Sequence, residues 1–540
     1  MGPAIEIAPR LAQLRDDLGH RRIQRGIETI EGLRPELETL TPDRRRAGVF
    51  LGLIAQWVDA GFDSPDLLVR LLSKFPPESR AALPLVEYLH LRMAQGVVDM
   101  ANEDFDRAAV HFRLVETFES EVRDAELMAI ANFWTGRCLR KTGQYEEALS
   151  HTIRAEELAL SCGYLPMAAI MQVTRSWLAF QKGRLHEALD LLRIAEEALS
   201  RTDDYLNRGN IQSAYGRIAR RQGQYESALH SFERALEEYR AGGRSHLQLA
   251  RTLQNLAFVK RLHSMQLQKQ IDLIAASRRS GSAGSAQTAP TRSRVEEIRL
   301  EAAAHVSESM EVYARYHNHR GIAGGHIIRG FLRLDAGDLE DAAGEAAEAF
   351  RHGDEKRDYF TMARARTLQS IVENAAVEEQ IGNPERHREA AARFAADAVS
   401  FAGHTQNRRL LARALVWQGL TLSGGANPDR DAARRCCDQA TSLLQPDASE
   451  RQYVWEELEL LKSAVLRAGP IDPMLRAWSA GILENTSFQQ VTEEFARIVI
   501  PKVWEREDRK VSRVAHKLSI SPKKVRRILN DVRLRENRGL

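Results

Sequence analysis

The sequence has 540 residues, of which 43% are hydrophobic, 6% aromatic and 28% charged. This length argues against a single compact domain, and the apolar content is enough to bury an extended core. Ala, Leu, Arg and Glu dominate while aromatic and β-branched residues are sparse, and straight-chain residues lose little rotamer freedom in a helix. We therefore expect an all-α protein.

Targeting and membrane signals are not evident in the sequence. The segment Met1 to Pro9 has neither a basic region followed by an apolar run nor a lipidation pattern, and no stretch of 18 uncharged apolar residues occurs. We expect a cytoplasmic protein without membrane contact. The four cysteines form no C-x-x-C pair and lie at no zinc-finger spacing from histidines, so we interpret them as small buried residues: Cys138, Cys162, Cys436 and Cys437.

Positive charge is concentrated at the C-terminal end. The formal net charge of the chain is +3, yet residues 502–540 hold 13 Lys or Arg against 5 Asp or Glu. The preceding residues are therefore slightly acidic as a whole. A basic segment of this kind favours contact with a polyanion.

A repeat of 40 residues organises the middle of the chain. Gly143, Gly183 and Gly223 each begin a turn, with a large residue two positions later and Ala three positions after that. The same register continues upstream through Phe105 and downstream from Gly337. The positions 5, 9 and 12 residues after each glycine fall on one helical stripe: Ala148, Thr152 and Ala155; Ala188, Leu192 and Ala195; Ala228, Phe232 and Ala235.

Small residues also recur seven positions before each turn, as Gly136, Ser176 and Gly216. The pattern predicts pairs of helices that cross closely at these positions. It resembles the tetratricopeptide repeat (TPR) family, whose pattern has a small residue at the helix crossing, then Gly, an aromatic residue and Ala around the turn. The resemblance covers roughly residues 44–465. The 40-residue period exceeds the 34 residues usual in the family, which implies longer helices or linkers.

The repeats are interrupted once and then end. Ser277 to Ser293 is rich in Ser, Gly, Ala, Thr and Arg, so we expect a disordered insert within a long second helix, after a fourth turn near His263. Ala468 to Pro473 contains two prolines and predicts a domain boundary. We divide the chain into an N-terminal helical cap (1–43), a TPR-like α-solenoid (44–467), a linker (468–473) and a small C-terminal domain (474–540).

The C-terminal domain has the pattern of a helix-turn-helix. An amphipathic helix over 488–504 precedes a helix over 511–518, a short turn over 519–521 and a basic helix from Pro522. Ser521 is a good N-cap residue and Pro522 a good first helical residue. A small core is expected from Val514, Leu518, Ile520, Val525, Ile528 and Leu529.

This segment resembles the C-terminal helix-turn-helix of the Fis (factor for inversion stimulation) class. The match rests on Ser512, Ala515, Leu518, Ile520 and Ser521, while the usual turn glycine is Ser519 here and the loop asparagine is Lys510. The resemblance implies binding of double-stranded DNA, with the basic helix in the major groove. It also implies a homodimer through the preceding helix, on the stripe Val491, Phe495, Ile498 and Val499. The candidate DNA-binding residues are Arg513, Lys517, Lys523, Lys524, Arg526 and Arg527.

A second candidate surface lies on the first helices of the repeats, which line the concave face of such a solenoid. Basic residues follow the small crossing residue in three repeats, and a Trp takes this place in another. We expect a groove for an acidic or carboxylate-ended peptide, although cations near helix C-termini can also simply complement the helix dipole. The candidate residues are Asn132, Arg137, Arg140, Lys141, Trp177, Arg217, Arg220, Arg221, Lys260 and Arg261.

No catalytic motif stands out in the sequence. Walker loops, dinucleotide fingerprints, nucleophile elbows and H-E-x-x-H are missing. The histidines at 317, 319 and 326 have no carboxylate or cysteine at ligand spacing, so we expect neither a metal nor another cofactor.

Two functions compete on these observations. The first is a DNA-binding transcriptional regulator whose solenoid binds a protein or peptide. The second is a repeat scaffold for complex assembly, in which the C-terminal helices dock or dimerise. Neither is an enzyme.

Overall fold

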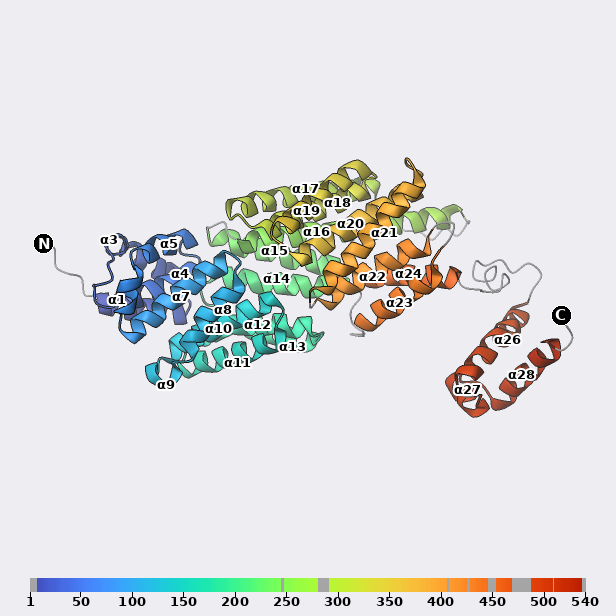
Figure 1. Ribbon diagram of the computed structural model, residues 1–540, viewed down its shortest axis with the longest axis horizontal. Coiled ribbons are helices and arrows are strands. Elements are labelled where there is room, and N and C mark those ends of the chain that lie inside the picture. The colour runs from blue at the N-terminus through green and yellow to red at the C-terminus, as the bar shows by residue number, and fades with distance from the viewer. Residues whose placement is uncertain are drawn as a thin grey trace.

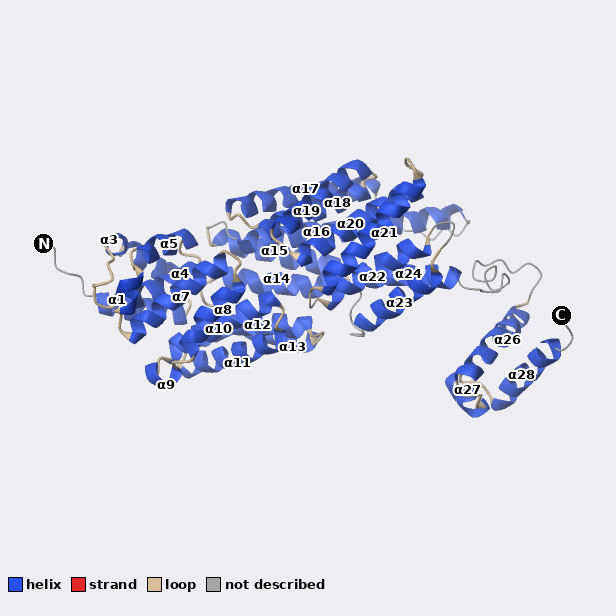
Figure 2. Ribbon diagram, viewed as in Figure 1, coloured by secondary structure: helices blue, strands red, loops and turns tan. Residues whose placement is uncertain are grey.

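The computed structural model describes residues 7–243, 247–279, 291–405, 407–424, 428–444, 453–468, 487–507 and 509–536. These residues form helices joined by short turns and loops (Figure 2). The fold is all-α, as the composition predicted. No helix in these ranges is both long and apolar enough to cross a membrane.

Six helices precede the regular repeats. One of them, α4, is almost completely buried and packs against α7 of the first hairpin. The bounds are α1 Ile7–Gly19, α2 Ile23–Glu31, α3 Arg34–Glu38, α4 Ala47–Asp59, α5 Pro65–Ser73 and α6 Pro77–Ala81.

Helical hairpins then follow one another along the solenoid, each packing against the next (Figure 1). The first helices of the hairpins are α7 Leu85–Ala101, α10 Ala125–Thr142, α12 Leu165–Gln181, α14 Tyr205–Arg221, α16 Leu247–Arg279, α18 His319–Asp335, α20 Tyr359–Glu378 and α22 Arg408–Ser423. The second helices are α8 Phe105–Glu116, α11 Tyr145–Ser161, α13 Leu185–Leu199, α15 Tyr225–Ala241, α17 Arg292–Arg315, α19 Leu339–Glu355, α21 Pro384–Gly403 and α23 Arg430–Leu443. The short α9 (Glu119–Val122) precedes α10, and α24 (Tyr453–Ala468) packs against α22 and α23.

The register read from the sequence is confirmed. Gly143 has a φ of 90°, a left-handed conformation that favours glycine, and it ends α10. A Cβ added to Gly136 would lie 2.7 Å from Thr152 Oγ1, so the crossing of α10 and α11 requires a residue without a side chain. All nine stripe positions are fully buried: Ala148, Thr152, Ala155, Ala188, Leu192, Ala195, Ala228, Phe232 and Ala235.

The expectation for the fourth repeat was wrong in its boundaries. No turn occurs near His263, because α16 continues without interruption to Arg279. The described ends of the expected insert are helical or cap a helix: Thr291 accepts a hydrogen bond from the Arg294 backbone N–H at 3.2 Å and so begins α17. The interruption therefore falls between two packed helices, not within a second helix, and residues 280–290 lie outside the described residues.

Bonds between distant segments tie the N-terminal helices to α14. The Asp203 carboxylate accepts hydrogen bonds from the backbone N–H groups of Ile23 and Gln24, both at 2.7 Å, at the start of α2. The neighbouring Asp204 caps α14 and binds Arg21 Nε at 2.6 Å, with both side chains buried. We call Arg21, Asp203 and Asp204, with the start of α2, the N-terminal clamp. It joins residues about 180 positions apart in the chain.

Three further helices form a separate small bundle, α26 Phe488–Arg506, α27 Val511–Lys517 and α28 Pro522–Glu536 (Figure 1). Its buried core consists of Ile500, Val514, Ala515, Val525 and Ile528, with Leu518, Ile520 and Leu529 packed against it. The core expected from the sequence is thus confirmed. The sequence pattern predicts the basic helix over 522–530, and α28 continues beyond that range to Glu536.

We predict that Ala148→Glu or Ala228→Glu destabilises the solenoid by about 3 kcal/mol or more, because each places a carboxylate in a closed helix crossing. Thermal unfolding followed by circular dichroism measures the loss. The exposed neighbours Ser150→Glu and Ser227→Glu on the same helices serve as controls and should change little. Equal melting of the buried and exposed variants would contradict the register.

We also predict that Arg21→Ala lowers the free energy of unfolding by roughly 3–5 kcal/mol, because it leaves the buried Asp204 carboxylate without its cationic partner. Arg154→Ala is the control, since Arg154 is exposed and pairs with the exposed Glu119. Its loss should be at most about 1 kcal/mol. If chemical denaturation gives the same loss for both variants, the clamp does not stabilise the fold.

Candidate ligand cavity and nucleic-acid interface

The first helices of the repeats enclose a cavity of about 170 Å³. Helices α10, α12, α14 and α16 supply most of its lining, and α1 and α4 close one side. The lining combines apolar side chains such as Ile130, Met167 and Met171 with several guanidinium groups. Such a mixed surface suits a ligand that has both apolar and anionic groups.

Helical periodicity explains which residues reach the cavity. Lining residues on each first helix recur three or four positions apart, for example Ile130, Trp134 and Arg137 on α10 and Ile170, Thr174 and Trp177 on α12. The opposite stripe of each first helix packs against the second helix of its hairpin. The small crossing residues thereby fix which side chains face inward.

Four of the sequence-predicted groove residues line this cavity: Arg137, Arg140, Trp177 and Arg217. Arg137 is neutralised there, because its Nη1 donates to both oxygens of Asp59 at 2.8 and 2.6 Å. Arg140 instead lies over the Trp177 ring, 4.9 Å from its centroid. Arg140 therefore remains available for an anionic ligand, whereas Arg137 already has a carboxylate partner.

Five cations of the first helices are neighbours, because Arg251 acts electrostatically on each of the other four, and three of them line the cavity. We call Arg140, Lys141, Arg217, Arg220 and Arg251 the inner cation cluster. Within the described chain, none of the five forms an ion pair, and Arg220 donates only to the neutral amide of Asn255, at 2.9 Å. Arg140, Arg217 and Arg220 are half-buried, while Lys141 and Arg251 are exposed. Half-buried charged groups commonly have a partner, so this surface can accept an anionic ligand.

Dehydrating these cations and bringing them together without an anion lowers the pKa of four of them. Loss of hydration, together with the neighbouring Arg251 and Arg137, lowers the pKa of Arg140 to about 9. The same loss of hydration and the neighbouring Arg251 lower the pKa of Arg217 and of Lys141 well below their usual values. Burial also lowers the pKa of Arg220. A bound anion would offset both the dehydration and the mutual repulsion.

Four predicted groove residues have structural partners instead, and we remove them from the candidate surface. Asn132 is buried and bonded to His151 of α11. Arg221 lies over the Phe180 ring, 3.5 Å from its centroid, and donates to the Phe180 carbonyl. Lys260 pairs with Glu301, and Arg261 forms two bonds to Asp335 at 2.6 and 2.8 Å. Each of these contacts links two helices, a relation that sequence spacing did not reveal.

The sequence-based search missed Arg251. It considered only residues that follow the small crossing residue, whereas Arg251 lies in the first part of α16. The cavity-lining stripe runs along the whole first helix, as Asn210, Ser213 and Arg217 show on α14. The same spacing of three to four residues, continued toward the start of α16, predicts that Arg251 belongs to the lining stripe.

The candidate nucleic-acid interface is the exposed side of α28. Lys523, Lys524 and Arg526 are exposed, and none of them pairs with a described carboxylate. Ser521 caps the helix, accepting from the Lys524 backbone N–H at 3.2 Å. Ser519, at the position of the usual turn glycine, has a φ of 51° and thus keeps the left-handed turn.

The remaining predicted DNA-binding residues differ in their surroundings. Arg527 pairs with Glu493 of α26 at 2.9 Å, and Lys517 pairs with Glu507. Arg513 is exposed on α27. Arg527 and Lys517 must therefore exchange a carboxylate for any phosphate they contact, which makes them weaker candidates than Lys523, Lys524 and Arg526.

The expected dimer stripe on α26 is visible in part. Phe495 is 51% exposed, which is unusual for a large apolar side chain, and Val499 is half-buried. The side chains of Val491 and Ile498 lie outside the described residues. Ile500, one position further on, faces the core of the bundle.

These features define a TPR-like helical solenoid with an inner cationic cavity, followed by a three-helix bundle with a basic helix. Residues 207–266, which span α14, α15 and the start of α16, match the tetratricopeptide repeat family. No curated protein matches the sequence significantly.

Solved structures with a similar fold include a Rap protein complexed with Competence and Sporulation Factor. The identity is 13%, the TM-score is 0.53, and the match covers 74% of this chain and 99% of the Rap chain. The apo form of the quorum sensor NprR from B. thuringiensis matches with 12% identity and a TM-score of 0.47, covering 72% of this chain and 98% of NprR. The match to the Rap protein, at this low identity, supports the helical repeat fold alone.

Proposed function

We propose that this protein is a DNA-binding transcriptional regulator, not an enzyme, whose solenoid binds an acidic peptide in the inner cavity. The observation that carries the proposal is the inner cation cluster, five neighbouring cations that form no ion pair in the described chain, three of which, Arg140, Arg217 and Arg251, line the cavity. An acidic peptide supplies several carboxylates at once and can form bidentate bonds to guanidinium groups.

The mixed lining of the cavity favours a ligand with apolar as well as anionic groups, such as the side chains of a peptide, over a small inorganic anion. Apolar positions such as Met167, Met171 and Trp177 lie beside the cations and can accommodate side chains of an extended ligand. The Rap protein of similar fold is complexed with Competence and Sporulation Factor, which agrees with a solenoid of this kind binding a second molecule.

The DNA-binding half of the proposal rests on the C-terminal bundle. A capped helix with three exposed cations that pair with no described carboxylate, and a small core of its own, fits recognition of a duplex through its phosphates. A dimer through the exposed Phe495 face would double the number of phosphate contacts.

The second candidate is a scaffold in which the bundle serves as a dimerising unit. The exposed Phe495 side chain favours it, because an apolar face on a small bundle requires a covering partner. The two candidates differ in whether the full-length protein binds DNA.

We predict that Arg140→Glu/Arg217→Glu weakens binding of a fluorescein-labelled hexaglutamate peptide by at least tenfold, because two inner cations become anions. Fluorescence anisotropy with the full-length protein measures the affinity. The control Arg193→Glu/Arg201→Glu makes the same change of net charge at exposed positions and should bind like wild type.

If both double variants lose the same affinity for hexaglutamate, only the net charge of the protein matters, and the proposed peptide site is wrong. If wild type binds inorganic triphosphate but not hexaglutamate, the cluster is a phosphate site and the peptide proposal is wrong.

We predict that Lys523→Ala/Lys524→Ala/Arg526→Ala abolishes duplex DNA binding by the full-length protein without unfolding the bundle, since these side chains lie outside its core. Electrophoretic mobility shift at low salt measures binding. Wild-type affinity should fall on the order of 10³-fold over a fourfold rise in salt if a dimer makes about six phosphate contacts.

The matched control is Arg193→Ala/Arg315→Ala/Lys356→Ala, which removes three exposed cations from the solenoid. Its binding should equal wild type. If wild type binds no duplex at any salt concentration, or if the α28 variant binds as well as wild type, the scaffold becomes the better explanation.

A further inference from the structure

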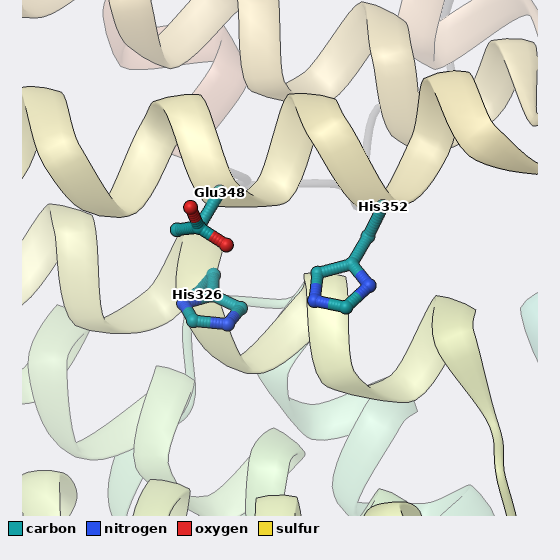
Figure 3. Close-up of side chains that lie close together, drawn as sticks. All are labelled: His326, Glu348 and His352. Atoms are coloured by element: carbon teal, nitrogen blue, oxygen red, sulfur yellow. The ribbon is translucent and has the colours of Figure 1, made fainter.

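Three potential metal ligands meet on the hairpin formed by α18 and α19. His326 comes from α18, and Glu348 and His352 come from α19 (Figure 3). One ligand atom from each residue lies within 4.8 Å of the others. The imidazole rings of His326 and His352 stack with their centroids 5.6 Å apart.

Local geometry brings these groups to one side. Glu348 and His352 are four residues apart and therefore lie on the same face of α19. That face is turned toward His326, because α18 and α19 pack as the two helices of one repeat. The sequence-based expectation of no metal considered only ligands close to His326 in the chain, whereas the carboxylate and second imidazole come from the next helix.

A neighbouring carboxylate orients His326 for coordination. Glu345 Oε2 lies 2.7 Å from His326 Nδ1, and Arg329 holds the other oxygen of Glu345 at 2.9 Å. With Nδ1–H donating to Glu345, the lone pair is on Nε2. Carboxylate and histidine pairs of this kind orient the imidazoles of many metal sites and raise their basicity.

A cationic side chain, that of Arg351, contacts two of the three proposed ligands. The Arg351 guanidinium lies 2.8 Å from Glu348 and 3.3 Å from Nε2 of His352. Arg351 and Glu348 are exposed, so the guanidinium can leave at little cost and the carboxylate can turn inward. The three ligand atoms need to move roughly 1–2 Å closer to one another. A single metal ion can then bond to all three at about 2.0–2.2 Å.

We propose that His326, Glu348 and His352 bind a divalent transition metal ion of the Zn²⁺ type and thereby cross-link α18 and α19. Two imidazoles and one carboxylate are ligands that suit Zn²⁺, and water completes the four-coordinate shell. The site lies apart from the inner cation cluster and does not depend on the peptide or DNA proposals.

Isothermal titration of metal-free full-length protein with Zn²⁺ tests the site. His326→Ala/His352→Ala should lose one equivalent of bound Zn²⁺ or bind it at least tenfold more weakly. His186→Ala/His230→Ala removes two exposed histidines from α13 and α15 and should bind like wild type. Circular dichroism confirms that each variant is folded.

Two further variants shift affinity in opposite directions. Glu345→Gln should weaken Zn²⁺ binding about tenfold, because His326 loses its orienting carboxylate. Arg351→Ala should tighten binding severalfold, because the competing guanidinium is gone. The proposal is overturned if the double histidine variant keeps the wild-type stoichiometry and affinity, or if Arg351→Ala weakens binding.

Discussion

The close crossing of two helices within each repeat is the constraint on which the other features depend. Gly136 and Gly216 leave no space for a side chain at their crossings, and the equivalent Ser176 is buried, so the rotation of each first helix about its axis is fixed. That rotation decides which side chains are buried and which reach the cavity. The inner cation cluster is therefore a consequence of packing between helices whose sequences are otherwise dissimilar.

Pairing separates structural cations from those available to a ligand. Arg137, Arg261 and Arg413 are each bonded to a carboxylate from another helix and contribute to the stability of the superhelix. Arg140 and Arg217, which are half-buried, form no ion pair with any described residue and have other cations as charged neighbours. Natural proteins seldom keep such groups unpaired unless a ligand uses them.

Local patterns in the sequence were sufficient to predict the helical repeat and the fold of the C-terminal bundle. The period of 40 residues placed the buried stripe correctly, and the cap at Ser521 and the core around Val525 follow from adjacent residues. Contacts between distant residues could not be read in this way. The partner of Arg137 lies 78 residues earlier and that of Arg261 lies 74 residues later, so their roles required the folded structure.

The N-terminal clamp has a consequence for biosynthesis. In an ordinary repeat protein each unit contacts only its neighbours, so the first repeats can reach their final contacts as soon as they emerge. Here the start of α2 depends on Asp203, which is translated about 180 residues later. At 5–20 residues per second, the N-terminal helices wait roughly 10–40 s for their partner. The last step in forming the first part of this solenoid is thus timed by synthesis of its fourth hairpin.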